Sequence, residues 1–214
     1  HQYPPDKIGG AELYTQAISR ALAHRGHAVA VFYRRDAPGQ GLEHRLEDGV
    51  HIDAVWDGEA GSARRFLYTF RNTWIHQALI RVLDEFRPNV IHIQHLMGLP
   101  VNVVRQRSVP FILTLHDYWW LCPNAQLLTN YSSKVCDGPR YGNCARCILA
   151  RAGLPGLWPT IPFLAGLSAW RNRLLRTMLE EACALIAPTE FVRRWYVTHG
   201  VPEEKIIVLP HGLE

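Results

Sequence analysis

The chain has 214 residues, of which 48% are hydrophobic and 20% charged, so it can bury the core of one large or two small domains. This composition excludes a disordered or collagen-like protein, and a net charge of +4 is too small for a protein that coats nucleic acid. Five cysteines, an odd and clustered set, do not suit a disulfide scaffold and indicate a reducing compartment.

Helical periodicity is the first pattern along the chain. Apolar residues recur at three- and four-residue spacing over residues 10–24, and Gly26 follows at a position typical of a helix end. Short apolar runs predict strands over residues 27–33 and 50–56, with a polar loop around Pro38 between them. Since sheets of this kind begin with a central strand and none precedes the first helix, we expect a fragment that lacks its first strand.

Helices and strands alternate through the rest of the chain, apart from a Cys- and aromatic-rich insertion at residues 117–162. We predict this insertion to be irregular, and loops of such length are usually functional. The alternation predicts an α/β protein with a doubly wound, mostly parallel Rossmann-like sheet and helices on both faces. The expected helices span residues 64–86, 163–183 and 189–199, and the expected strands residues 89–95, 110–116, 184–188 and 205–210.

Two adjacent glycines, Gly9 and Gly10, stand directly before the first predicted helix. Backbone amides and the positive end of the helix dipole can hold a phosphate at such a position, where a side chain would block the approach. An ordinary glycine-rich helix start is the alternative, because the spacing matches neither the dinucleotide-binding nor the Walker pattern. The pair is therefore a candidate anion site.

His116 and Asp117 follow a predicted parallel strand, at the edge where open α/β sheets bind ligands. An imidazole there can donate to a phosphate or a sugar hydroxyl. A structural histidine, with Asp117 capping a turn, is the alternative. The same reasoning makes His95 a second candidate, whereas we expect His92 to face the core.

Four cysteines lie in the insertion, and the last two form a CxxC pair. Four thiolates satisfy a tetrahedral zinc ion, and such closed sites are structural. Free or reversibly oxidised thiols and an iron–sulfur cluster stay open as alternatives, because the other spacings are loose. Cys183 lies on an apolar helix face and is expected in the core. The candidate zinc ligands are Cys122, Cys136, Cys144 and Cys147.

Residues 154–176 combine aromatic and aliphatic side chains with arginines. This composition fits an interfacial segment on an anionic membrane, or a groove for a lipid-linked substrate. A core helix with a solvated basic face is the alternative. Prolines and glycines interrupt the uncharged stretch over residues 152–170, so we expect no spanning helix there.

Taken together, several segments resemble the N-terminal half of retaining GT-B glycosyltransferases of family 4. Their order and spacing match along nearly the whole chain, and the cysteine insertion resembles one found in a subset of these enzymes. The segments are Tyr3-Pro4-Pro5, Gly9-Gly10-Ala11-Glu12, Arg25-Gly26-His27-Ala28-Val29, Pro88-Asn89-Val90-Ile91-His92, Thr114-Leu115-His116-Asp117-Tyr118, Ala187-Pro188-Thr189-Glu190-Phe191, Gly200-Val201-Pro202-Glu203-Glu204-Lys205-Ile206 and Pro210-His211-Gly212.

The resemblance implies a two-domain enzyme in which residues 1–214 form the acceptor-side half. A C-terminal half, absent from this chain, would grip a UDP- or GDP-sugar. Gly9 and Gly10 would then lie against the donor diphosphate, and His116 would be the catalytic residue, in contact with the transferring sugar or its phosphate. The residues expected on the acceptor side are Tyr3, His95, Asp117 and Tyr118.

The implied reaction is retaining, front-face transfer of a hexosyl group to a glycan or lipid-linked saccharide in polysaccharide biosynthesis. The departing diphosphate would be stabilised by helix N-termini and basic groups, so no catalytic metal or other cofactor is expected. We expect the fragment alone to be inactive. The expected location is the cytoplasm, including peripheral contact with the inner face of the membrane.

Three other functions fit parts of the sequence. A non-catalytic binding domain would keep the fold and lose the site, but Gly9, Gly10, His116 and Asp117 are present. A zinc-containing nucleic-acid binder would use the cysteines and arginines, and the small net charge argues against it. A nicotinamide oxidoreductase would need the G-x-G-x-x-G pattern, which this sequence lacks.

Overall fold

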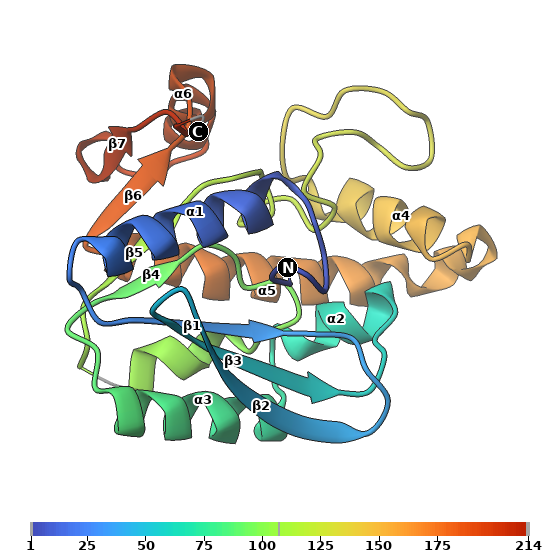
Figure 1. Ribbon diagram of the computed structural model, residues 1–214. Coiled ribbons are helices and arrows are strands. Elements are labelled where there is room, and N and C mark those ends of the chain that lie inside the picture. Colours follow the sequence, from blue (N-terminus) through green and yellow to red (C-terminus); the bar gives the residue numbers. More distant parts are fainter. Residues whose placement is uncertain (1, 107, 213–214) are drawn as a thin grey trace. The chain divides into compact units, whose positions relative to one another are not determined.

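The computed structural model describes residues 2–106 and 108–212, and the chain divides into two compact units, His1–Pro110 and Phe111–Glu214. Both units contain parallel strands flanked by helices (Figure 1). The α/β class with a mostly parallel, Rossmann-like arrangement is therefore confirmed. No helix in the described part of the chain is both long enough and apolar enough to cross a membrane.

The first unit contains a sheet in the order β1-β3-β2, in which β1 is parallel to β3 and β2 is antiparallel to it. Helix α1 connects the N-terminal loop to β1 (Figure 1). The elements are α1 (Gly10–His24), β1 (Val29–Arg34), β2 (Gln40–Glu47), β3 (Val50–Asp57), α2 (Ser62–Tyr68), α3 (Thr73–Phe86), β4 (Ile91–Ile93) and a 3-10 helix (Val101–Gln106).

Helix α1 agrees with the sequence prediction at both ends. Gly26 has a φ of +87°, and its amide donates to the Ala23 carbonyl at 2.9 Å. The next amide, of His27, donates back to the Leu22 carbonyl at 3.2 Å. This is the Schellman arrangement, which favours glycine because a side chain is strained at positive φ.

The polar loop predicted around Pro38 is wrong, because Gln40–Glu47 forms strand β2. None of its residues is buried, and it contains no apolar run from which a strand could be predicted. The turn that follows it does carry a signal: Asp48 and Gly49 both have positive φ, 52° and 79°, as a two-residue hairpin turn requires. An Asp-Gly pair between two strands is therefore the feature that predicts this hairpin.

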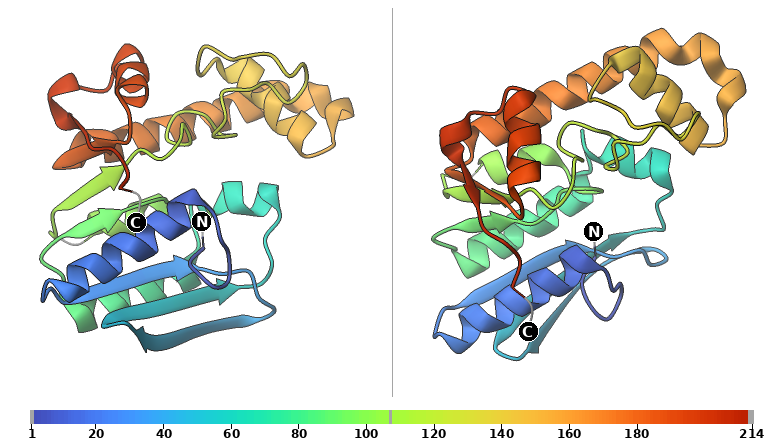
Figure 2. Two further views of the ribbon diagram at one scale, coloured as in Figure 1. Left: turned by 45° about the horizontal axis from the view of Figure 1, so that its top comes forward. Right: turned by 90° about the horizontal axis from the view of Figure 1, so that it is seen from above.

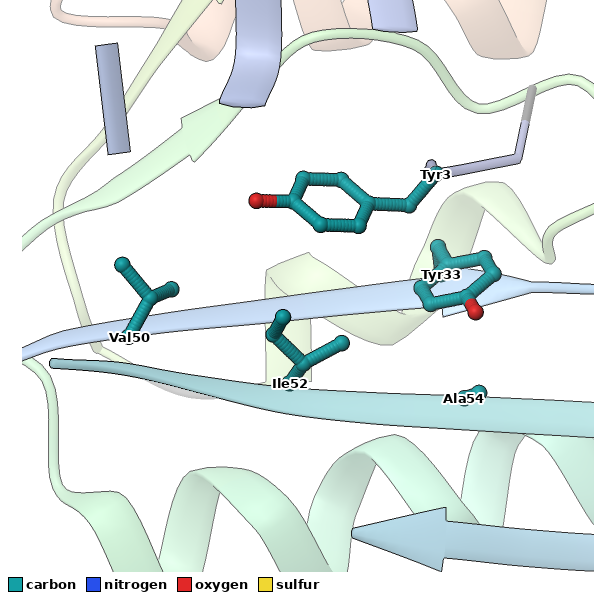
Figure 3. Close-up of a cluster of buried hydrophobic side chains, with 5 residues drawn as sticks. All are labelled: Tyr3, Tyr33, Val50, Ile52 and Ala54. Carbon is teal, nitrogen blue, oxygen red and sulfur yellow. The ribbon is translucent and has the colours of Figure 1, made fainter. Parts of the chain in front are cut away.

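The helix predicted over residues 64–86 is also wrong in part, since it breaks into α2 and α3. The second helix starts at an N-cap, Asn72, whose side-chain oxygen accepts a hydrogen bond from the Ile75 amide at 3.0 Å. The Asn72 amide nitrogen also donates to the Asp57 carboxylate at 2.9 Å. A core cluster in this unit joins β1, β3 and the N-terminal loop (Figure 3), and consists of Tyr3, Tyr33, Val50, Ile52 and Ala54.

The second unit contains three parallel strands in the order β5-β6-β7. Helices connect them, as parallel strands require. The elements are β5 (Phe111–Thr114), α4 (Tyr141–Arg151), a 3-10 helix (Pro155–Thr160), α5 (Ile161–Glu181), β6 (Ala184–Ala187), α6 (Glu190–Thr198), a 3-10 helix (Glu203–Lys205) and β7 (Ile206–Val208).

The insertion at residues 117–162 is only partly irregular, which corrects the prediction. Its second half forms α4 and a 3-10 helix, and α4 lies against α5 (Figure 2). Its first half is held by two buried polar side chains of α5. Arg171 donates to the Trp119 carbonyl at 2.7 Å, and Asn172 donates to the Leu121 carbonyl at 2.9 Å. These bonds satisfy carbonyls that strand pairing does not reach.

Candidate functional site

The N-terminus of α1 carries the glycine pair and is open at Gly10. Gly9 is the N-cap in extended conformation, and as a glycine it has no side chain with which to cap the helix. Gly10 is exposed, and a Cβ added there would meet nothing within 4 Å. The first amides of the helix and the positive end of its dipole are therefore available to an anion at Gly10.

Glu12 occupies the space beside Gly9. Its side chain is only 3% exposed, and a Cβ at Gly9 would meet Glu12 Oε2 at 2.5 Å. Glu12 is the third helical residue, the position from which a carboxylate commonly turns back to the helix start. A carboxylate here repels a diphosphate, so an anion reaches the helix on the Gly10 side. Sequence reasoning missed Glu12, although its position three residues after Gly9 was the signal.

Tyr3 and His95 both lie in the first unit and line one cavity of about 610 Å³ together with Glu12. Tyr3 is 1% exposed, and its ring packs against Tyr33 with centroids 5.7 Å apart (Figure 3). The Nδ1 of His95 accepts a hydrogen bond from the Met97 amide at 2.9 Å, so the neutral ring carries its proton on Nε2. The acceptor-side roles of both residues stay predictions.

His92 lines the same cavity, on β4. Burial lowers the pKa of His92 to about 4, so the ring is neutral at physiological pH. His92 is half-buried and lines the cavity, so its expected place in the core stays a prediction.

In the second unit, the ends of β5 and β7 bring two imidazoles together. His116 Nδ1 lies 3.2 Å from His211 Nε2, and the ring centroids are 5.0 Å apart. Burial lowers the pKa of His211, which keeps that ring neutral near pH 7. Sequence reasoning included His211 in a motif but did not propose it as a site residue. The signal was its position directly after a parallel strand, which it shares with His116.

Asp117 and Tyr118 order the loop that follows His116. Asp117 Oδ1 accepts a hydrogen bond from the Trp119 amide at 2.8 Å, and its carbonyl accepts one from the Tyr196 hydroxyl at 2.6 Å. The Tyr118 ring stands edge-on to Trp195, with centroids 4.8 Å apart. Burial, followed by the charge of Asp117, raises the pKa of Tyr118. Asp117 thus caps the turn, which was the structural alternative predicted for it. Acceptor-side roles for Asp117 and Tyr118 stay predictions.

All five cysteines are free thiols. Cys183 is exposed, so the prediction that it lies in the core is wrong. It precedes β6, and its backbone amide donates to the Phe111 carbonyl at 2.9 Å. Within residues 2–106 and 108–212, no three His, Cys, Asp or Glu side chains are arranged to hold a metal ion. The predicted zinc is therefore unconfirmed.

Comparison with known proteins identifies the family. A family model described as Glycosyltransferase Family 4 matches residues 8–214, which include both the glycine pair and His211. The chain belongs to glycosyltransferase family 4. An uncharacterized 42.6 kDa protein in the cps region of Klebsiella pneumoniae is 25% identical over 146 residues. That alignment covers 61% of this chain and 38% of that protein.

Each unit by itself carries a feature that suits phosphate or hydroxyl oxygens. The first unit has the N-terminus of α1 at Gly10, and the second has the His116–His211 pair; both can provide hydrogen-bond donors.

Proposed function

We propose that this chain is the acceptor-side, N-terminal half of a retaining hexosyltransferase that uses a UDP- or GDP-sugar. The observation that carries the proposal is the His116–His211 contact, at the ends of two parallel strands, in a chain matched to family 4 over residues 8–214. The donor would be held mainly by a second, C-terminal half of the full-length enzyme. The acceptor would be a glycan or a lipid-linked saccharide.

His211 gives His116 a defined proton position. If His211 Nε2–H donates to His116 Nδ1, a neutral His116 carries its own proton on Nε2. His116 then presents a donor to the leaving phosphate or to a sugar hydroxyl. Burial lowers the pKa of His211, which favours the neutral ring needed for this arrangement. In this scheme His116 is the catalytic residue and His211 positions it.

The N-terminus of α1, in the first unit, is proposed to bind the donor diphosphate. Charge develops on the departing diphosphate as the sugar–oxygen bond breaks, and fixed amide dipoles stabilise such charge without reorganisation. Gly10 leaves the amides of the first turn accessible, and the buried carboxylate of Glu12 keeps the anion away from Gly9. The dipole of α1 would therefore stabilise a diphosphate bound at this end of the first unit, with no step assigned to a cofactor.

Kinetics of the full-length enzyme test the histidine pair. His116→Ala should lower kcat/KM for transfer about 10²- to 10³-fold, the usual effect of losing a fixed donor. His211→Phe should lower it about tenfold, the equivalent of one hydrogen bond. Because both act through one ring, the double variant should lose little more than His116→Ala. His24→Ala, on the exposed end of α1, is the matched control and should keep wild-type activity.

A second part of the proposal concerns the surface from which the enzyme would reach a lipid-linked acceptor. Large apolar side chains are exposed on the 3-10 helix at Pro155–Thr160 and on α5, with Phe163 72% and Trp158 69% exposed. Between Gly138 and Leu179 every charged residue is an arginine. Aromatic groups beside arginines suit the interface of an anionic bilayer. We therefore assign this surface to peripheral contact with anionic lipid, where a lipid-linked acceptor would be presented.

Vesicle sedimentation tests this assignment. The full-length protein should sediment with vesicles that contain phosphatidylglycerol and less with vesicles of phosphatidylcholine alone, and added salt should weaken the binding. Trp158→Ala combined with Phe163→Ala should abolish it. Tyr131→Ala removes an aromatic that is 44% exposed outside this surface and should change nothing. Equal sedimentation of the double variant and the wild type would rule out this surface.

A further inference from the structure

The four cysteines of the insertion line one small cavity in the second unit, with a volume of about 20 Å³. Two come from the irregular segment, Cys122 and Cys136, and two from the beginning of α4, Cys144 and Cys147. A cavity of this size accommodates about one water molecule or one ion. The fifth cysteine, Cys183, is exposed and is not among the lining residues.

We propose that these four thiols bind one zinc ion as a closed, structural tetrathiolate site. Binding replaces four S–H bonds with four Zn–S bonds, releases four protons, and leaves a centre with a net charge of −2. No oxidation or reduction is involved. The CxxC pair places two sulfurs one helical turn apart, and the irregular segment brings the other two to the same cavity.

The surroundings of the cavity suit a negatively charged centre. The Asn124 side-chain nitrogen donates to Cys147 Sγ at 2.8 Å, and the Asn130 backbone amide lies 3.2 Å from the same sulfur. Such N–H donors stabilise a thiolate and orient a metal ligand.

Arg171 supplies the opposite charge. It is fully buried, yet its hydrogen bonds go to neutral groups, the Trp119 carbonyl and the Asn172 side-chain oxygen. Burial lowers the pKa of Arg171 to about 10, and Cys122 and Cys144, when ionised, act against this lowering. A buried cation without a carboxylate bonded to it is costly. A zinc–thiolate centre beside it would compensate that cost.

In the thiol form described here, two of the sulfurs are engaged outside the cluster. Cys136 Sγ donates to the Gly138 carbonyl at 3.3 Å, and Cys147 Sγ contacts the Leu128 carbonyl at 3.8 Å. Because the described residues hold no ready metal-ligating group, metal binding requires both side chains to give up these contacts by rotating about their Cα–Cβ bonds.

Metal analysis of the full-length protein, purified without chelator, tests the proposal. Near one equivalent of zinc should be present in the wild type and in Cys183→Ser, and less than about 0.1 equivalent in Cys144→Ser. Cobalt added to chelator-treated wild type should give the intense visible bands of tetrahedral thiolate coordination. Substoichiometric zinc without those bands, labile sulfide with iron, or disulfides in intact mass spectra would each overturn the proposal.

Discussion

Replacing Gly10 with alanine separates the two reasons for a glycine at the start of α1. If Gly10 serves only as the start of the helix, alanine should leave the stability of the protein unchanged or raise it. Gly10 is the first helical residue, it is exposed, and an added Cβ meets no atom within 4 Å. Alanine loses less backbone entropy than glycine in a helix, so the free energy of unfolding should rise by about 0.5 kcal/mol and by 1 kcal/mol at most. For a domain of this size, Tm should rise by about 1–3 °C.

Donor binding should weaken in the same variant, although the protein becomes more stable. If a diphosphate approaches the first-turn amides, the alanine methyl group occupies part of the same space. The Kd for the nucleotide sugar should then rise about tenfold, which corresponds to about 1.4 kcal/mol. Thermal unfolding and donor titration of the full-length enzyme measure the two effects on one sample.

Gly142→Ala is the matched control for Gly10→Ala. Gly142 is the second residue of α4, is exposed, and likewise has no atom within 4 Å of an added Cβ. It should gain similar stability and leave donor affinity unchanged. A more stable Gly10→Ala protein with wild-type donor affinity would refute the anion site and leave only the ordinary helix start.

Three further predictions concern stability. Burial alone would raise the pKa of Asp36, but the hydrogen bond and charge of Arg34 lower it below 3.8. The stabilisation that the ionised carboxylate gives the folded protein is therefore lost as pH falls below that value. Asp36→Asn should reduce the fall in urea midpoint on acidification. Burial lowers the pKa of His92 to about 4, so the unfolded chain binds a proton at this residue more readily than the folded protein does. The free energy of unfolding should therefore fall as pH falls from 6.5 to about 4, and His92→Leu should make Tm less dependent on pH over that range. Gly49 has a φ of +79°, so Gly49→Ala should lower the free energy of unfolding by about 1–2 kcal/mol; an unchanged urea midpoint would contradict the strained turn.

The elements that sequence predicts well are those whose local and tertiary preferences agree. Helix α1 has both an apolar stripe and a terminal glycine at positive φ, and its bounds are predicted correctly. The parallel strands β5, β6 and β7 are short apolar runs between helices, which identifies them without any contact information. Their predicted ends differ by a few residues, because hydrogen bonding rather than hydropathy defines a strand end.

The elements that sequence predicts poorly depend on tertiary contacts. Strand β2 is polar and owes its existence to pairing with β3, where Gly41 lies directly under the Trp56 ring. Helix α4 lies within a cysteine-rich segment and packs against α5, so composition alone indicates a loop. The break before α3 follows from the Asn72 cap and its bond to Asp57, which links residues far apart in sequence.

The candidate site divides in the same way. His116 and the glycine pair follow from a rule about strand and helix ends, and the structure places them at such ends. His211 could not be proposed from sequence as a partner of His116, because their contact joins residues far apart in the chain. Glu12 requires knowing that its side chain folds back beside Gly9 and is buried there.

The stereochemistry of the product is the most direct measurement of the central proposal. The full-length enzyme should be supplied with UDP- and GDP-hexoses whose anomeric configuration is known, and the product analysed by NMR at the anomeric proton. The account predicts that transfer keeps the donor's configuration and falls about 10²- to 10³-fold in His116→Ala. Inverted product, or unchanged transfer in that variant, would contradict it.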